Sequence, residues 1–187
     1  MGLATDLYAQ DYNDYIPCFL ENNFPYKIGI YKTLLQYCKN PDIFFCPENG
    51  KNYKWGGVLL FSRDDTNANP MSYGFNVMGT GDNTGYYPID LNSPKKATSV
   101  KVPGRLIAIA DNSNYGAVNA LYEISMNPNA LFRNTWPTPT HNGGCNVLFA
   151  DGHVEWKTID HMCSYANEVL KLWNYENSST VYAWPDN

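Results

Sequence analysis

Three side chains in the last third of the sequence have the clearest chemical potential. His141, Asp151 and His153 supply imidazole and carboxylate groups, which bind metal ions and exchange protons near neutral pH. His141 precedes a predicted strand through a flexible Asn-Gly-Gly segment, and His153 adjoins a predicted turn, so the two histidines are able to approach each other. The spacing fixes no third ligand, and an Asp at a turn hydrogen-bonds its own backbone. We therefore expect a structural role for this trio, ahead of a metal site or catalysis.

Calcium is the other ion for which the sequence offers ligands, because oxygen-bearing side chains are abundant in two polar loops. Asp64, Asp65 and Asn67 form one candidate, and Asp82 with Asn83 forms another. Neither loop has the twelve-residue EF-hand order, with glycine sixth and glutamate twelfth. Solvated polar loops are the simpler interpretation, so we expect no cofactor, with calcium as the alternative.

The five cysteines do not form a recognisable metal or redox motif. No CxxC occurs, and with five cysteines at least one thiol would stay unpaired within a monomer. The spacing leaves the disulfide pairing open. Burial of the cysteines as small apolar side chains is at least as good an interpretation. The positions are Cys18, Cys38, Cys46, Cys145 and Cys163. The sequence also lacks GxSxG, and Gly79-Thr80-Gly81-Asp82 is not followed by the Lys-Ser/Thr of a phosphate loop. We therefore expect a protein that is not an enzyme.

Composition predicts one globular domain over residues 1–187. Apolar residues make up 44% and charged residues 17%, and fifteen tyrosines accompany many Asn, Gly and Pro residues, a mixture that favours a location outside the cytosol. The net charge is −5, and the longest basic run is only Lys95-Lys96, so nucleic-acid binding by charge is not expected. No run approaches the roughly 18 apolar residues of a membrane span.

Hydrophobic periodicity predicts three helices, over residues 3–15, 26–38 and 159–173. Pro17 ends the first helix and Asn40-Pro41 the second. The first helix carries an aromatic stripe that we expect to pack against a sheet. The stripes of the first two helices are Leu3, Ala4, Leu7, Tyr8, Tyr12 and Tyr15, then Ile30, Tyr31, Leu34, Leu35 and Cys38.

Short segments rich in β-branched and aromatic residues predict strands over residues 58–61, 72–78 and 106–110, separated by long loops at 62–70 and 79–94. Residues 145–158 predict a hairpin around Asp151-Gly152, a pair favoured in two-residue turns. That turn would place Phe149 opposite Val154 and Val147 opposite Trp156, on one apolar face.

The segment from His141 to Val154 has a histidine, nine intervening residues and then Asp151-Gly152. It resembles the C-terminal signature of a bacterial family of prepilin-processing-associated proteins, which are similar to type II secretion G-type pseudopilins and type IV pilins. Four further segments resemble family blocks in the family's order, namely residues 7–17, 43–47, 72–76 and 105–111. Cys145 and the long loop at 112–140 depart from the pattern.

The resemblance implies an α+β, pilin-like head, with a truncated N-terminal helix on a small antiparallel sheet with long loops. It assigns residues 1–16 to the end of that helix, 141–158 to the signature hairpin and 174–187 to a tail. It also implies a preceding leader and hydrophobic helix, which would be the only contact with a membrane. The expected location is an inner-membrane anchor with a periplasmic head, or a filament at the cell surface. The expected partners are other pilin or pseudopilin subunits and the secretion machinery.

The sequence leaves two rival interpretations open. An extracellular carbohydrate- or ligand-binding module would use exposed aromatic residues such as Trp55, Trp136 and Trp184. An uncharacterised hydrolase would need a concave pocket with a perturbed titratable group.

Overall fold

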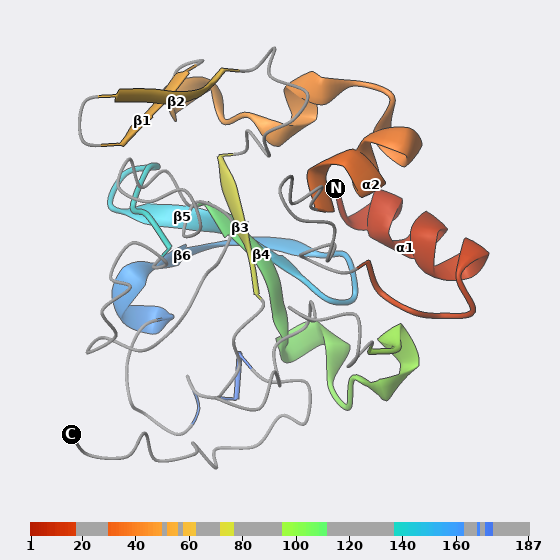
Figure 1. Cartoon of the computed structure of the whole chain (residues 1–187). Helices are drawn as coiled ribbons and strands as arrows, with labels where there is room; N and C mark the ends of the chain where they lie inside the picture. Colours follow the sequence, from red (N-terminus) through yellow and green to blue (C-terminus); the bar gives the residue numbers. More distant parts are fainter. Residues whose placement is uncertain are drawn as a thin grey trace, which may run out of the picture.

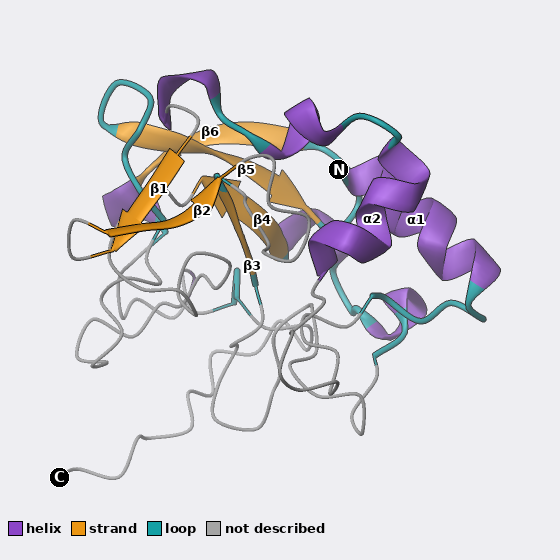
Figure 2. Ribbon diagram, turned by 45° about the horizontal axis from the view of Figure 1, so that its top comes forward, coloured by secondary structure: helices purple, strands orange, loops and turns teal. Residues whose placement is uncertain are grey.

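The chain folds as an α+β protein in which helices near the N-terminus lie beside a small antiparallel sheet (Figures 1 and 2). The computed structural model describes residues 1–17, 30–49, 52–55, 58–62, 72–76, 95–111, 137–162, 168 and 171–173. This confirms the predicted combination of an N-terminal helix with a small antiparallel sheet.

The main sheet has four antiparallel strands in the order β3-β4-β5-β6. Their bounds are Tyr73–Phe75, Ile107–Asp111, Gly144–Phe149 and Val154–Thr158. Every residue of β4 is buried, as expected of an inner strand rich in isoleucine and alanine. A separate hairpin consists of β1 (Asn52–Trp55) and β2 (Val58–Ser62). All predicted strands are thus present, although residues 77–78 of the second lie outside the described part of the chain.

A bulge in β4 determines which side chains face each side of the sheet. Ile107 pairs with Phe149, but Ile109 pairs with Leu148, so the register shifts at Ala108. Before the shift Ile107 packs in the cluster that contains Phe149, whereas Ile109 packs in the opposite cluster. An extra residue in one strand reverses the alternation beyond it. By the same alternation Asp111, two residues after Ile109, falls on the side of Ile109.

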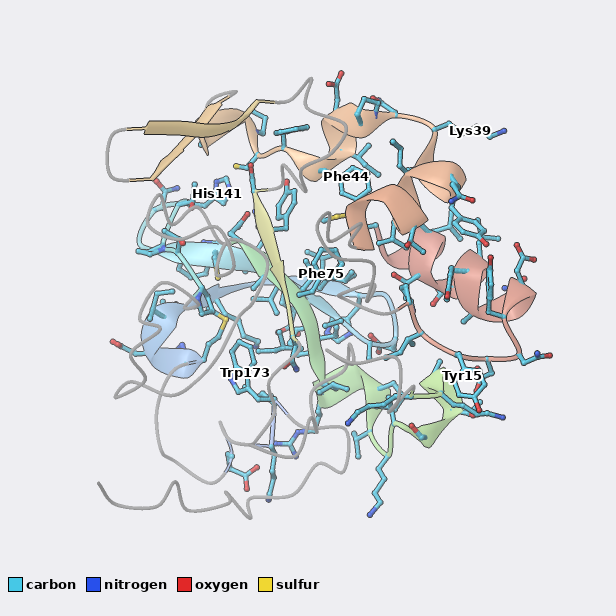
Figure 3. The ribbon with its side chains drawn as sticks, viewed as in Figure 1. Tyr15, Lys39, Phe44, Phe75, His141 and Trp173 are labelled. Carbon is cyan, nitrogen blue, oxygen red and sulfur yellow. The ribbon has the colours of Figure 1, made fainter. Side chains whose placement is uncertain are left out.

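The two faces of the sheet carry two separate hydrophobic clusters. The helix-side cluster contains Leu34, Phe44, Phe75 and Ile109, and the opposite cluster contains Trp173 with residues of β5. Figure 3 shows Phe44 and Phe75 between β3 and the helices, with Trp173 well away from them. The sheet is therefore covered on both faces.

The first helix, α1 (Gly2–Asp11), is shorter than predicted and buries a different face. It ends at Asp11 because Asn13 and Asp14 adopt positive φ, and Tyr15 then forms a β-bridge with Lys96. The predicted aromatic seam is wrong. Of the predicted stripe Ala4 is buried, together with Thr5 and Ala9 from outside it, while Leu3, Leu7, Tyr12 and Tyr15 are exposed. Small side chains occupy the buried face because they allow the helix to approach its neighbours closely.

The second helix, α2 (Ile30–Cys38), ends where the sequence predicts, and Leu34 is fully buried. Residues 26–29 of the prediction lie outside the described residues. Asn40 then caps a 3₁₀ helix, Pro41–Phe44, by accepting a hydrogen bond from the Asp42 N–H at 2.9 Å. Further 3₁₀ helices span Pro47–Asn49, Ala97–Ser99, Pro103–Arg105 and Ile159–His161. The last of these stands at the start of the predicted C-terminal helix, most of which lies outside the described residues, as does the tail.

The Asp-Gly hairpin exists, but its register differs by one residue from the prediction. Leu148 pairs with Val154 and Val147 with Glu155, because the loop has three residues instead of two. Gly152 donates to the carbonyl of Phe149 at 3.0 Å, and Gly152 alone of the Asp-Gly pair has positive φ. This is the geometry of a type I turn followed by a left-handed glycine. As a result Val154 and Trp156 are exposed and do not share the buried face of Val147 and Phe149.

Within the described ranges, none of the helices combines the length and the apolar content that crossing a bilayer requires.

Candidate functional site

Three potential metal-ligating side chains meet at one end of the sheet. The Sγ atom of Cys46 lies 3.4 Å from Nε2 of His141, and the same nitrogen lies 3.4 Å from Oδ2 of Asp111. One donor atom from each residue lies within 4.8 Å of the other two. Cys46 and Asp111 are buried, and His141 is partly exposed. Figure 3 shows His141 near the start of β5.

Each residue is positioned by a different local structure. Cys46 lies between the 3₁₀ helices Pro41–Phe44 and Pro47–Asn49, and the Ser72 N–H anchors this segment by donating to the carbonyl of Phe44 at 2.8 Å. Asp111 is the last residue of β4, beyond the bulge. The site therefore joins segments that are far apart in the sequence.

The backbone of His141 is held by a tight turn. Its N–H donates to the carbonyl of Gly144 at 2.9 Å, and its own carbonyl accepts from the Gly144 N–H at 3.1 Å. Trp156 also donates its ring Nε1–H to this carbonyl at 2.9 Å. Positive φ at Asn142 and Gly143 closes the turn. The Asn-Gly-Gly segment, expected from the sequence to be a flexible connection, thus fixes the histidine.

Burial dominates the electrostatics of Asp111, whose side chain is 0% exposed. Burial raises the pKa of its carboxyl group, and a hydrogen bond from the Asn146 N–H to Oδ2 at 2.7 Å opposes that shift. Its second oxygen, Oδ1, has no hydrogen-bond partner within the described structure. Tyr73 lies beside the same groups, since burial and then the charges of Cys46 and Asp111 raise its pKa to about 12. The centre is thus a low-dielectric site with an unsatisfied acceptor.

The arrangement does not match a Cys-His-Asp catalytic triad. In such a triad the two ring nitrogens have separate partners, because one takes the nucleophile's proton while the other donates to the carboxylate. Here Nε2 of His141 contacts both Cys46 and Asp111. The three donor atoms instead lie within 4.8 Å of one another, close enough for a single cation to contact all three.

The trio singled out in the sequence does not assemble. Nδ1 of His153 lies 2.5 Å from Oδ1 of Asp151, and its Nε2 lies 3.7 Å from Glu155. The ring of His153 stacks on Phe149 with centroids 4.3 Å apart. His141 is instead at the other end of β5, with Cys46 and Asp111. Asp151 also accepts from the backbone N–H of His153 at 3.1 Å, which is the turn-stabilising role expected of it.

The other predicted site residues lie outside the part of the chain that the structure describes. These are the calcium candidates Asp64, Asp65, Asn67, Asp82 and Asn83, the cysteines Cys18 and Cys163, and the tryptophans Trp136 and Trp184. The backbone of Trp55 lies in β1, but its side chain is not among those described.

Sequence reasoning missed Cys46 and Asp111 as site residues. A signal was available for Asp111, because an acidic residue that ends an inner apolar strand is an unusual choice. Nothing in the sequence placed Cys46 beside it, since that contact depends on the fold of the intervening segments.

Comparisons with known proteins add no family to this description. No protein-family model, curated protein or solved structure matches the chain.

Proposed function

We propose that this chain is the non-catalytic head of a pilin-like or pseudopilin-like subunit of a type II secretion or type IV pilus-like assembly. The observation that supports this most is the packing of the N-terminal helix on the signature hairpin. A Cβ atom on Gly2 would lie 3.3 Å from both δ carbons of Leu148 and 3.9 Å from Cα of Gly152. The first turn of α1 therefore lies against β5 and the hairpin turn.

The Asp-Gly pair of the signature is also packed from a second direction. A Cβ atom on Gly104, in the 3₁₀ helix before β4, would lie 2.9 Å from Oδ2 of Asp151. The turn is thus enclosed by α1 on one side and by residue 104 on another. These contacts support a structural role for the signature, in which Asp151 and Gly152 fix the turn against which α1 packs.

The outward face of α1 supports a role in assembly. Leu3 is 72% exposed, Leu7 is 37% exposed and Tyr12 is 51% exposed. Leu3 and Leu7 are four residues apart and so lie on the same side of the helix. Burying such side chains against a partner stabilises an interface by roughly 25 cal/mol for each Å² of apolar surface. We propose that neighbouring subunits cover this face.

In this proposal the head contributes lateral contacts, and a preceding hydrophobic helix supplies the anchor and the filament core. The subunit would be located in the inner membrane with its head in the periplasm, or in a filament at the cell surface. The loops would meet other subunits, the secretion machinery or secreted proteins. Single contacts between heads are weak, and repetition along a filament gives them their strength.

Site-specific photo-cross-linking in cells that make the whole protein tests the proposal. A photoreactive amino acid is placed at Leu3 or Leu7, and at Asp160 as an exposed control in the 3₁₀ helix after β6. We expect cross-linked multimers of this protein, or products with related subunits, from the α1 positions and much less from Asp160.

A second readout is the cell fraction that contains these products. Membranes and sheared surface filaments should hold them. Monomeric protein in the soluble fraction, with no α1-dependent cross-link, would contradict the assembly role. Glycan binding that is lost on replacing Trp55, Trp136 or Trp184 by alanine would favour the carbohydrate-binding alternative.

A further inference from the structure

We propose that Cys46, Asp111 and His141 are the protein ligands of a single zinc ion, which ties the 3₁₀ segment around residue 46 to the end of the sheet. The pilin-like function proposed above requires no metal, so this inference stands or falls separately from it. It also differs from the calcium sites and the His141-Asp151-His153 trio considered from the sequence.

The distances between the donor atoms fit tetrahedral zinc. Zinc binds cysteine sulfur at about 2.3 Å and histidine nitrogen or carboxylate oxygen at about 2.0–2.1 Å, so tetrahedral angles place sulfur and nitrogen about 3.5 Å apart. The same geometry places nitrogen and oxygen about 3.3 Å apart. The observed separations are 3.4 Å for Cys46 Sγ to His141 Nε2 and 3.4 Å for His141 Nε2 to Asp111 Oδ2. The third pair, Cys46 and Asp111, also lies within 4.8 Å, so a small movement of the side chains would allow one zinc ion to contact all three atoms.

The unsatisfied oxygen of Asp111 is an independent indication of a ligand. Its side chain is fully buried, one oxygen accepts from the Asn146 N–H, and Oδ1 has no hydrogen-bond partner in the described structure. A buried carboxylate with an unpaired oxygen is costly, and buried charges are normally paired or bound to a metal. A cation bound at Oδ2, the oxygen 3.4 Å from His141 Nε2, would neutralise the carboxylate to which the unpaired Oδ1 belongs.

The site is also pre-organised. The turn at residues 141–144 and the Trp156 ring N–H hold the backbone of His141. Asp111 is held by its pairing with Tyr73 of β3 and by the hydrogen bond from the Asn146 N–H. Ligands whose orientation is fixed by neighbouring hydrogen bonds bind a metal more tightly than mobile ones do.

The donor set selects the class of metal. Thiolate and imidazole prefer zinc and related transition metals, whereas calcium and magnesium prefer a shell of oxygen atoms. On binding, the Cys46 thiol loses its proton to solvent and the sulfur coordinates as thiolate, while the imidazole binds through its neutral Nε2. Three protein ligands leave a fourth coordination position, which a water molecule fills in zinc sites of this kind.

The experiment measures metal binding to the purified protein after chelation and under a non-thiol reductant. Zinc is titrated calorimetrically, and thermal unfolding is followed with and without zinc. Cobalt(II) replaces zinc as a spectroscopic probe, since a bound thiolate gives a sulfur-to-cobalt charge-transfer band and tetrahedral geometry gives intense visible bands. We expect one ion per chain, a higher melting temperature with zinc, and both sets of cobalt bands.

The ligand variants are Cys46→Ser and His141→Gln. Each should lower zinc affinity roughly 100-fold or more, because even changes in the outer hydrogen-bonding partners of a metal site cost about 10–100-fold. Cys46→Ser should also remove the charge-transfer band. The matched controls are Cys38→Ser, which alters a half-buried thiol on α2, and His153→Gln, which alters the surface His-Asp pair; both should bind like the wild type.

Two results would overturn the inference. One is the absence of a thiolate-to-cobalt band in the wild-type protein, a measurement that does not depend on any variant folding. The other is zinc binding that survives both ligand variants, or that disappears in His153→Gln. Circular dichroism of the metal-free variants separates lost binding from lost structure.

Discussion

Gly2 of α1 lies so close to Leu148 of β5 that a Cβ atom would come within 3.3 Å of both δ carbons of the leucine. This contact joins the start of the chain to the hairpin near its end. The inner face of α1 therefore stabilises the head, whereas its outer face is exposed. The proposed function assigns this outer face to contacts with partners.

Substitutions on the two faces of α1 should therefore differ in how much they destabilise the isolated head. Gly2→Leu forces extra methylene groups against Leu148 and should lower the free energy of unfolding by about 1–3 kcal/mol. Leu3→Ala changes an exposed side chain and should alter it by less than about 0.5 kcal/mol. Urea unfolding of the two variants measures both values. Equal losses would show that the assigned faces are wrong.

Asn76 should be among the polar residues most important for stability. It is fully buried, and its Nδ2 donates to the carbonyls of Ile107 at 2.7 Å and Trp173 at 3.0 Å. Asn76→Ala removes both donors from buried carbonyls and should cost about 1–3 kcal/mol in urea unfolding. Asn146→Ala is the control, because the Asn146 side chain is exposed and contributes less to the contact with Asp111 than the Asn146 backbone N–H does. A loss of similar size in both variants would contradict the role assigned to Asn76.

Gly144 has no room for a side chain, because β6 packs directly against it. A Cβ atom there would lie 2.5 Å from the carbonyl oxygen of Lys157 and 2.5 Å from a ring carbon of Trp156. Gly144→Ala should cost roughly 1–3 kcal/mol or more and, by moving His141, should also weaken zinc binding. Gly143→Ala is the comparison, since that residue has positive φ but open space around it, and its cost should be about 1 kcal/mol. A larger effect at Gly143 would contradict this account of the turn.

Asp14 should make the fold more sensitive to acid. Hydrogen bonds from the Thr98 hydroxyl and then from the Thr98 backbone N–H lower the pKa of the Asp14 carboxyl group. A carboxyl group whose pKa is lowered by folding stabilises the fold above its unfolded pKa of about 4. That contribution is lost as the pH falls through the lower, folded pKa.

Asp14→Asn removes the titration while keeping a side chain that tolerates the positive φ at this position. The difference in stability between wild type and variant should be largest near neutral pH and should shrink below about pH 4. Its size should stay below about 1 kcal/mol because the group is near solvent. Thermal unfolding across this range measures it, and a difference that grows on acidification would contradict the assignment.

The elements of the fold were largely predictable from sequence, but their faces and register were not. Strands 58–61 and 106–110 follow from β-branched and apolar runs, and α2 ends before Asn40-Pro41 as the turn residues predict. The face of α1 was largely mistaken because periodicity favours large side chains, whereas close packing selected Thr5 and Ala9 beside the predicted Ala4. The hairpin register depended on the length of the turn. Asp151-Gly152 is compatible with either length, and only Gly152 took positive φ.

The candidate site was predictable only in part. His141 was recognised as a chemically capable residue, but its partners were sought nearby in the sequence, at Asp151 and His153. The bulge at Ala108 places Asp111 on the helix-side face of the sheet. The capped 3₁₀ helix Pro41–Phe44 precedes Cys46 and positions its side chain. The bulge depends on how β4 pairs with β5, and the position of Cys46 beside Asp111 depends on how the intervening segments fold, so no local pattern in the sequence specifies either.

The central claim, that the head assembles through α1, is tested most directly by the distribution of the protein between cell fractions. The whole protein is compared with a Leu3→Asp, Leu7→Asp double variant, since charges on the exposed apolar face should oppose contact with a neighbouring subunit. We predict that the wild type is recovered mainly in membranes and sheared filaments, and that the variant is depleted from the filaments while its isolated head unfolds like the wild type. Equal amounts of both proteins in filaments, or no wild-type protein in either fraction, would contradict the account.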